Sequence, residues 1–242
     1  MDALTNGVTI KVGSASYHSF ADFGLAIGNN DYIGEPEYES YYVDVPGRDG
    51  FLDLSETVSG RVIYKKRKIS IEFGGMGTCN GWDATISNMR NLFHGKTVQL
   101  IFDNDTDWYW TGRAEINDYD RFRNMGTFKF EIPQADPFKY GINIVPDLAN
   151  IAVNHVVKKI TIPVTGVPVN PTFVVENLQL SSSTGYLHIT RRDSTDTDIA
   201  STTVTENGTY RFYNLWFESG DKVSLSVQGS ATVSIVYRQV SL

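Results

Sequence analysis

The sequence predicts a mainly β protein made of two modules with a single packed helix. Short segments rich in β-branched and aromatic residues recur along the chain and are separated by Gly, Asn and Asp, as in antiparallel sandwiches and barrels. Only residues 81–96 have a helical spacing of apolar residues. Aromatic and acidic residues become rarer after about residue 140, where Ser, Thr and Val are enriched as in exposed strands.

The first module has alternating segments that we expect to be strands, at residues 8–12, 38–45, 61–64, 69–73, 98–102, 108–117 and 127–132. Trp108 and Trp110 share one face of their strand, which predicts a core position more strongly than a sugar-stacking one. The acidic run Asp103–Asp107 lacks the Gly and Glu of a calcium loop, so it predicts a hairpin turn. The Gly74–Gly77 stretch predicts a flexible connection towards the helix.

The helix is predicted by one apolar face and by residues suited to its ends. The face consists of residues at positions i, i+4, i+7 and i+11, namely Trp82, Ile86, Met89 and Phe93. Asn80 is suited to cap its start and Gly95 to follow its end. The first module is therefore expected to be an antiparallel β-sandwich or split barrel with one packed α-helix.

A boundary between the modules is expected within Ala135–Asn150, where Pro and Gly interrupt any regular pattern. We therefore divide the chain into residues 1–140 and 141–242. The second module has expected strands at residues 159–164, 172–176, 186–191, 208–214, 222–227 and 232–237, a spacing typical of a second β-sandwich.

Composition and missing motifs exclude several classes of function. The chain has 21 basic and 28 acidic side chains, a net charge of −7 and one Cys, which argues against a nucleic-acid surface, a disulfide scaffold and a structural zinc site. Neither a signal peptide nor an apolar run long enough to span a membrane is visible. The four His have no metal-ligand spacing, and the common hydrolase and nucleotide-binding motifs are absent. We therefore expect no catalysis, no cofactor and no metal.

The segment between Val43 and Tyr140 carries a series of short motifs in a defined order. They are VPGRDG at Val45–Gly50, LDL at Leu52–Leu54, LFHGK at Leu92–Lys96, GR at Gly112–Arg113 and ADPFKY at Ala135–Tyr140. This series resembles the distal tail protein family of phages with long non-contractile tails and of related prophages of Gram-positive bacteria. The end of the chain is similar to the last strands of that family's galectin-like, or carbohydrate-module-like, β-sandwich.

The resemblance implies a structural protein of the virion that forms a homo-hexameric ring, single or stacked in two, at the distal tip of the tail. Residues 1–140 would form the ring-forming belt around a channel, and residues 141–242 the outer galectin-like sandwich. The ring would join the tail tube protein to a tail-associated lysin or fibre protein, with tape-measure and receptor-binding proteins as further partners. DNA would pass through without specific binding, and residues 1–140 carry −6 of the net charge.

Two sets of candidate site residues follow. Arg48 and Asp49 in VPGRDG, with Asp53 after it, are candidates for the subunit interface, although a hairpin turn whose charges face water explains the same residues. The alternative function is a carbohydrate- or host-receptor-binding module, in which Trp216 and Phe217 would contact a glycan.

Overall fold

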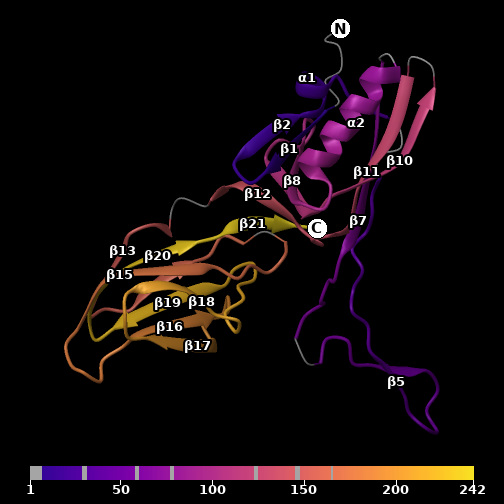
Figure 1. The fold of residues 1–242 in the computed structure, drawn as a ribbon. Coiled ribbons are helices and arrows are strands. Elements are labelled where there is room, and N and C mark those ends of the chain that lie inside the picture. Colours follow the sequence, from indigo (N-terminus) through magenta and orange to yellow (C-terminus); the bar gives the residue numbers. More distant parts are fainter. Residues whose placement is uncertain are drawn as a thin grey trace. The chain divides into compact units, whose positions relative to one another are not determined.

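The structure is a computed structural model that describes residues 7–28, 32–57, 60–76, 79–122, 125–144, 148–164 and 166–242. The chain divides into two compact units, residues 1–139 with Leu242 and residues 140–241. Both consist mainly of antiparallel strands (Figure 1), so the predicted mainly β class is confirmed. Within the described ranges, no helix has the length and apolar character needed to cross a bilayer.

One sheet of unit 1 contains the run β2-β1-β8-β9. Its members are β1 (Val8–Val12), β2 (Ala15–His18), β8 (Thr97–Phe102) and β9 (Trp108–Arg113). The register of β1 and β8 sets Ile10 opposite Leu100, and both side chains are buried. Residues 103–107 join β8 to β9 as the predicted hairpin turn. A short helix, α1 (Ser19–Phe23), follows β2 and was not predicted, because five residues are too few for a periodic pattern.

The other sheet of unit 1 has the order β10-β11-β7-β3, and β4 also pairs with β7. Its strands are β3 (Ala26–Ile27), β4 (Tyr32–Ile33), β7 (Arg67–Met76), β10 (Glu115–Phe122) and β11 (Met125–Ala135). Burial alternates strictly along most of β11, where Phe128 and Phe130 are fully buried. Both sheets and the longer helix contribute to one hydrophobic core, as expected for a sandwich with a packed helix.

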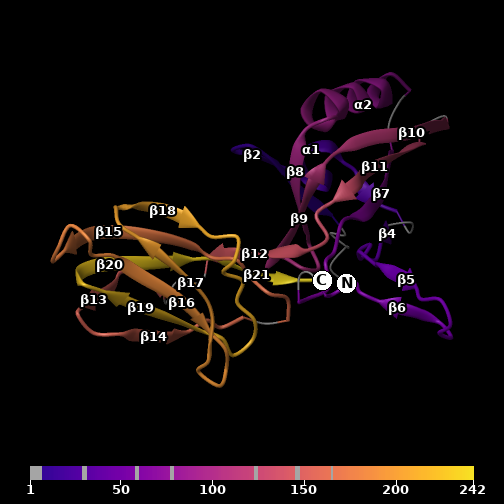
Figure 2. The same cartoon turned by 90° about the horizontal axis from the view of Figure 1, so that it is seen from below.

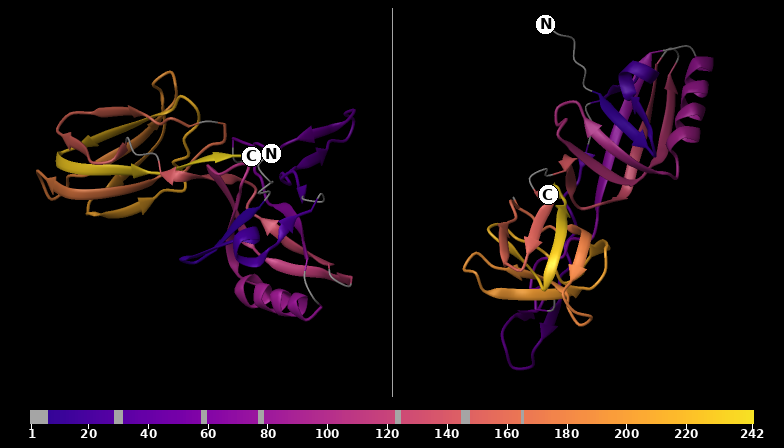
Figure 3. Two further views of the ribbon diagram at one scale, coloured as in Figure 1. Left: turned by 90° about the horizontal axis from the view of Figure 1, so that it is seen from above. Right: turned by 90° about the vertical axis from the view of Figure 1, so that its left-hand side faces the viewer.

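The longer helix, α2 (Cys79–Phe93), lies along one side of the β10–β11 pair in both views of Figure 3. The predicted face is confirmed, because all four of its apolar residues are at most 3% exposed. Gly95 has a φ of 75°, which confirms it as the left-handed residue after the helix. The expectation for Asn80 is wrong: α2 already begins at Cys79, so Asn80 lies inside the first turn, and its side chain lies outside the described residues.

Gly74 and Gly75 belong to β7 and not to a flexible connection, which corrects the prediction for that stretch; Gly77 lies outside the described residues. Gly75 is paired with Gly126 of β11, and the indole of Trp82 packs against this glycine pair. A Cβ atom on Gly126 would lie 2.8 Å from the indole ring. The glycines therefore provide a flat surface on which the helix can place its largest side chain.

Unit 2 is a sandwich of two four-stranded sheets, visible as two layers in Figure 2. One sheet has the order β13-β20-β15-β18 and the other β14-β19-β16-β17. The strands are β13 (Ile151–Asn154), β14 (Lys158–Thr161), β15 (Thr172–Leu180), β16 (Leu187–Arg192), β17 (Asp198–Val204), β18 (Gly208–Arg211), β19 (Lys222–Val227) and β20 (Gly229–Val236). Apolar residues that point between the sheets, such as Phe173, Ile189 and Leu225, are fully buried.

A further pair of neighbouring strands consists of β12 (Lys139–Ile144) and β21 (Arg238–Ser241). The guanidinium of Arg238 donates to the main-chain oxygens of Gly141 and Ile142, and thereby ties the end of the chain to β12.

Candidate functional site

One feature of unit 1 is a projection formed by residues 34–57 and 60–66, here called the arm, which extends away from β7 (Figure 1). Its two limbs are joined by main-chain hydrogen bonds. The N–H of Glu37 donates to Lys66, and the N–H of Lys65 donates back to Glu37, both at 2.7 Å. Beyond them, β5 (Tyr42–Asp44) and β6 (Phe51–Asp53) pair as an antiparallel hairpin. The arm is therefore an antiparallel ribbon and not an irregular loop.

The two limbs of the arm carry opposite charge. The outgoing limb carries four acids and no base, namely Glu35, Glu37, Glu39 and Asp44. The turn and the returning limb carry three acids and four bases, namely Asp49, Asp53, Glu56, Arg48, Arg61, Lys65 and Lys66. Glu37 pairs with Lys66, and Glu39 with Lys65, each at 3.8 Å. Exposed pairs of this kind stabilise by less than ~1 kcal/mol each. Three of the four bases lie near the root of the arm, so the hairpin at its end keeps an excess of carboxylates.

The VPGRDG motif forms the turn of that hairpin. Pro46 and Gly47 occupy the two central positions of a turn closed by the Arg48 N–H, which donates to the Val45 oxygen at 3.1 Å. Gly47 has a φ of 82°, so the turn has the positive φ and the Pro-Gly pair of type II. Gly50 has a φ of 77° and brings the chain into β6. The predicted tight turn is confirmed, and the two glycines are required by their left-handed conformation.

The three candidate interface residues lie together on this hairpin but in different environments. Arg48 and Asp49 are exposed at the turn. Asp53 instead closes the base of the hairpin, because its Oδ1 accepts the N–H of Ser55 at 2.9 Å and the hydroxyl of Ser55 at 2.5 Å. The hydroxyl of Ser55 in turn accepts the N–H of Tyr41 at 2.8 Å. Hydrogen bonds from the side chain and then the backbone of Ser55 lower the pKa of the Asp53 carboxyl.

One face of the hairpin presents two aromatic rings and two carboxylates. Cross-strand partners point to the same side of a ribbon, and the register pairs Tyr42 with Asp53 and Asp44 with Phe51. We call these four residues the tip face. Tyr42 is 54% and Phe51 69% exposed, which is unusual for large apolar side chains on a monomer surface. Phe51 was not selected from the sequence, although its alternation with Asp49 and Asp53 was the available signal.

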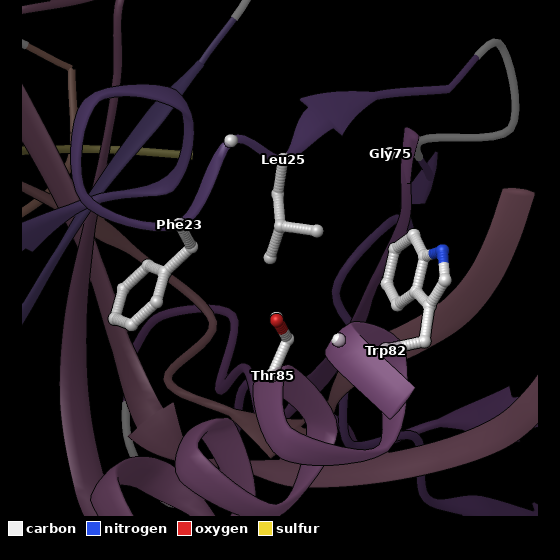
Figure 4. Close-up of a pocket in the computed structure, with 7 residues that line it drawn as sticks. Phe23, Leu25, Gly75, Trp82 and Thr85 are labelled. Carbon is white, nitrogen blue, oxygen red and sulfur yellow. The ribbon is translucent and has the colours of Figure 1, made fainter. Parts of the chain in front are cut away.

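A second feature of unit 1 is a hollow beside α2 (Figure 4), which we call the Trp82 pocket. It has a volume of about 140 Å³ and is lined by Phe23, Gly24, Leu25, Gly75, Gly81, Trp82 and Thr85. The hydroxyl of Thr85 points into the hollow, whose other labelled side chains are those of Phe23, Leu25 and Trp82 (Figure 4). The sequence did not reveal this pocket, because it is formed by three separate segments, namely the end of α1 with the two residues after it, β7 and α2.

A His–Asp pair elsewhere in unit 1 has a structural role. Nε2 of His18 lies 3.1 Å from a carboxylate oxygen of Asp103, which also accepts the N–H of Gly7 at 3.0 Å. Nδ1 of the same ring accepts the N–H groups of Phe20 and Ala21 and so caps the start of α1. Both ring nitrogens are thus engaged in holding the chain, which leaves neither as a base for catalysis. No cluster of three or more potential metal ligands occurs in the described ranges.

The two candidate glycan-contact residues of unit 2 differ in accessibility. Phe217 is 0% exposed and packs against Phe173 in the core, so it cannot contact a glycan. The expectation that Phe217 contacts a glycan is therefore wrong. Leu215 and Phe217 lie two residues apart, and this apolar spacing was the signal for a core position. Trp216 is half-buried, and its indole N–H donates to the main-chain oxygen of Tyr213 at 3.0 Å. The exposed ring at this loop is that of Tyr213, which is 95% exposed and was not selected from the sequence.

Comparison with known proteins identifies the fold. No family model and no curated protein matches the sequence. The structure is similar to the crystal structure of the SPP1 Dit (gp 19.1) protein, with a TM-score of 0.62 and 16% identity over 97% of this chain and 99% of that chain. The chain has the Dit fold. The predicted resemblance is thereby confirmed at the level of the fold, over both units. The SPP1 protein is described as a paradigm of the hub adsorption apparatus in phages that infect Gram-positive bacteria.

Proposed function

We propose that the chain is a structural protein of a phage tail that acts as a hub at the distal end of a non-contractile tail. The observation that carries this proposal is the likeness to the SPP1 hub protein, which extends over both units and not over one common sandwich alone. In this proposal unit 1 forms the belt of a homo-hexameric ring, and unit 2 is a galectin-like sandwich that faces outward. The ring joins the tail tube to the adsorption proteins below it and takes no part in catalysis.

The arm supports assembly through unit 1. Large apolar side chains gather on it in a way that a monomer does not need, with Tyr38, Tyr41, Tyr42 and Phe51 each more than half exposed. Repetition of one such contact between two different surfaces of the chain closes a ring if the rotation allows it. We therefore assign Arg48, Asp49 and the tip face, which contains Asp53, to the subunit interface.

The mass of the protein in solution tests the proposal. Light scattering over a range of concentrations should give the mass of six chains, or of twelve if two rings stack. Arg48→Glu should weaken association more than it lowers the melting temperature, because Arg48 is exposed in the folded chain. Lys158→Glu is the matched control, since it reverses an exposed charge in unit 2. A wild-type chain that stays monomeric at all concentrations would contradict the proposal.

The charge of unit 1 supports passage of DNA through the ring without binding. Residues 1–140 carry −6 of the net charge, and a surface of the same sign as phosphate avoids the affinity that released counterions supply. The assembled protein should therefore not retain duplex DNA on a filter even at about 50 mM salt, where such affinity is greatest. Retention that falls steeply with added salt would contradict an acidic channel.

A further inference from the structure

The Trp82 pocket has the size of a receptor for one aromatic ring. An apolar cavity of ~150 Å³ is large enough to bind benzene in another protein, and this pocket measures about 140 Å³. Phe23, Leu25 and the indole of Trp82 surround the hollow, and Thr85 supplies the one side-chain hydroxyl (Figure 4). A phenyl ring would thus find apolar contacts on several sides.

The walls of the pocket are held in place by close packing. Trp82 is 3% exposed and rests on the Gly75–Gly126 pair. Gly75 also lies close to the backbone of Gly24, because a Cβ atom on it would be 3.1 Å from the Gly24 oxygen. A pocket that exists before its occupant arrives costs little ordering free energy on binding.

The best-matched occupant in the described chain is Phe51. Its phenyl ring is 69% exposed, the highest value among the described phenylalanines, and it projects from a hairpin that is itself well ordered by hydrogen bonds. The arm runs away from α2 in Figure 1, so Phe51 cannot reach the pocket of its own chain. If Phe51 is the occupant, its ring therefore comes from another copy of the chain.

Charge favours the same pairing. Asp44 lies directly opposite Phe51 on the tip face and would accompany it to the rim of the pocket. Gly81 and Trp82, which line the pocket, belong to the first turn of α2, and that turn contains no acidic residue. The next residue, Asp83, is an exposed carboxylate that is paired with Arg121 at 2.9 Å. The start of a helix carries a partial positive charge and favours a nearby carboxylate.

We infer that Phe51 of one copy inserts into the Trp82 pocket of the next copy. This inference rests on the proposed assembly and names a contact that holds neighbouring copies together. Because the ring and the pocket belong to different parts of unit 1, the contact is heterologous, so it repeats from copy to copy until a ring closes.

A double-mutant cycle on the full-length chain tests the contact. Phe51→Ala removes the ring, and Thr85→Phe or the smaller Thr85→Leu fills the pocket. Each single change should weaken association by ~10-fold or more, as for a buried aromatic anchor. The double variant should be no weaker than the weaker single variant, because both changes remove the same contact. Tyr213→Ala, which removes a 95% exposed ring of unit 2, is the control and should leave association unchanged.

The outcomes separate this inference from the proposed function. If the wild-type chain associates and Phe51→Ala does not weaken it, the inference is wrong and the proposed assembly stands. If the single effects add in the double variant, Phe51 and Thr85 act at separate contacts and the inference is also wrong. A monomeric wild-type chain would overturn both. Melting temperatures of the variants show whether the pocket-filling chains fold; if Thr85→Phe does not, Thr85→Leu completes the cycle.

Discussion

Gly126→Ala tests whether Trp82 packs on the glycine pair in the way described. The added Cβ would lie 2.8 Å from two atoms of the indole and 3.2 Å from the Asp120 oxygen. These distances are too short, and a buried indole cannot turn away without disturbing the start of α2. Overpacking of this kind costs ~1–3 kcal/mol. For a unit of this size that corresponds to a fall in melting temperature of roughly 3–10 °C.

Gly74→Ala is the matched control for this prediction. Gly74 lies next to Gly75 in β7, but a Cβ on it would lie 3.6 Å from Thr127 and 3.8 Å from Gly126, which are ordinary contacts. Neither Gly74 nor Gly126 has a positive φ, so the two variants differ only in the space available. Gly74→Ala should leave stability unchanged or raise it by ~0.4–1 kcal/mol.

The assay is thermal unfolding followed by circular dichroism and by tryptophan fluorescence for both variants. If Gly126→Ala melts within about 1 °C of Gly74→Ala, the side chain of Trp82 does not lie on the glycine pair. The reasoning about the walls of the Trp82 pocket would then also fail.

Two further predictions concern ionised groups. Asp221→Ala should destabilise unit 2 by about 3 kcal/mol, because Asp221 is 4% exposed and pairs at 2.7 Å with Arg191. The charge of Arg191 would keep its longer contact with Glu218, at 3.4 Å. Urea unfolding monitored by Trp216, the one tryptophan after residue 140, measures this, and an unchanged midpoint would contradict it. The pKa of Glu131 is lowered from 4.5, mainly by a hydrogen bond from Lys68. The ionised carboxylate therefore contributes its full stabilisation above about pH 4.5, and this contribution is lost as the pH falls through the lower pKa of the folded state. Glu131→Gln should therefore reduce the loss of stability between pH ~5 and ~3, and equal losses in the two proteins would refute this assignment.

Strong local patterns were predicted well from the sequence. Val8–Val12 and Lys222–Val227 are strands with the predicted bounds, because alternation of apolar and polar residues can be seen in the local sequence itself. The helix was found for the same reason. By contrast, β17 (Asp198–Val204) was missed, since small Ser, Thr and Ala residues leave little contrast between its two faces.

Features that depend on distant segments were predicted less well. Trp110 is buried as expected, but Trp108 on the same strand is half-exposed, with the Lys139 ammonium 5.1 Å from its ring. Residues 38–45 were expected to form one strand, yet only Tyr42–Asp44 does, because the arm has no sheet beside it to regularise its pairing. The glycine pair under Trp82 depends on the register of two strands that are about 50 residues apart in sequence.

The turn at the end of the arm has a consequence for the thermodynamics of association. Proline at position 46 restricts the backbone, glycine at position 47 permits the positive φ of the bend, and the Asp53–Ser55–Tyr41 hydrogen bonds hold its base. The conformational entropy of this segment is therefore lost when the chain folds and not when two chains meet. A hairpin that is already rigid before the encounter should bind with a smaller entropic penalty, and copies of the chain can then associate through a small contact.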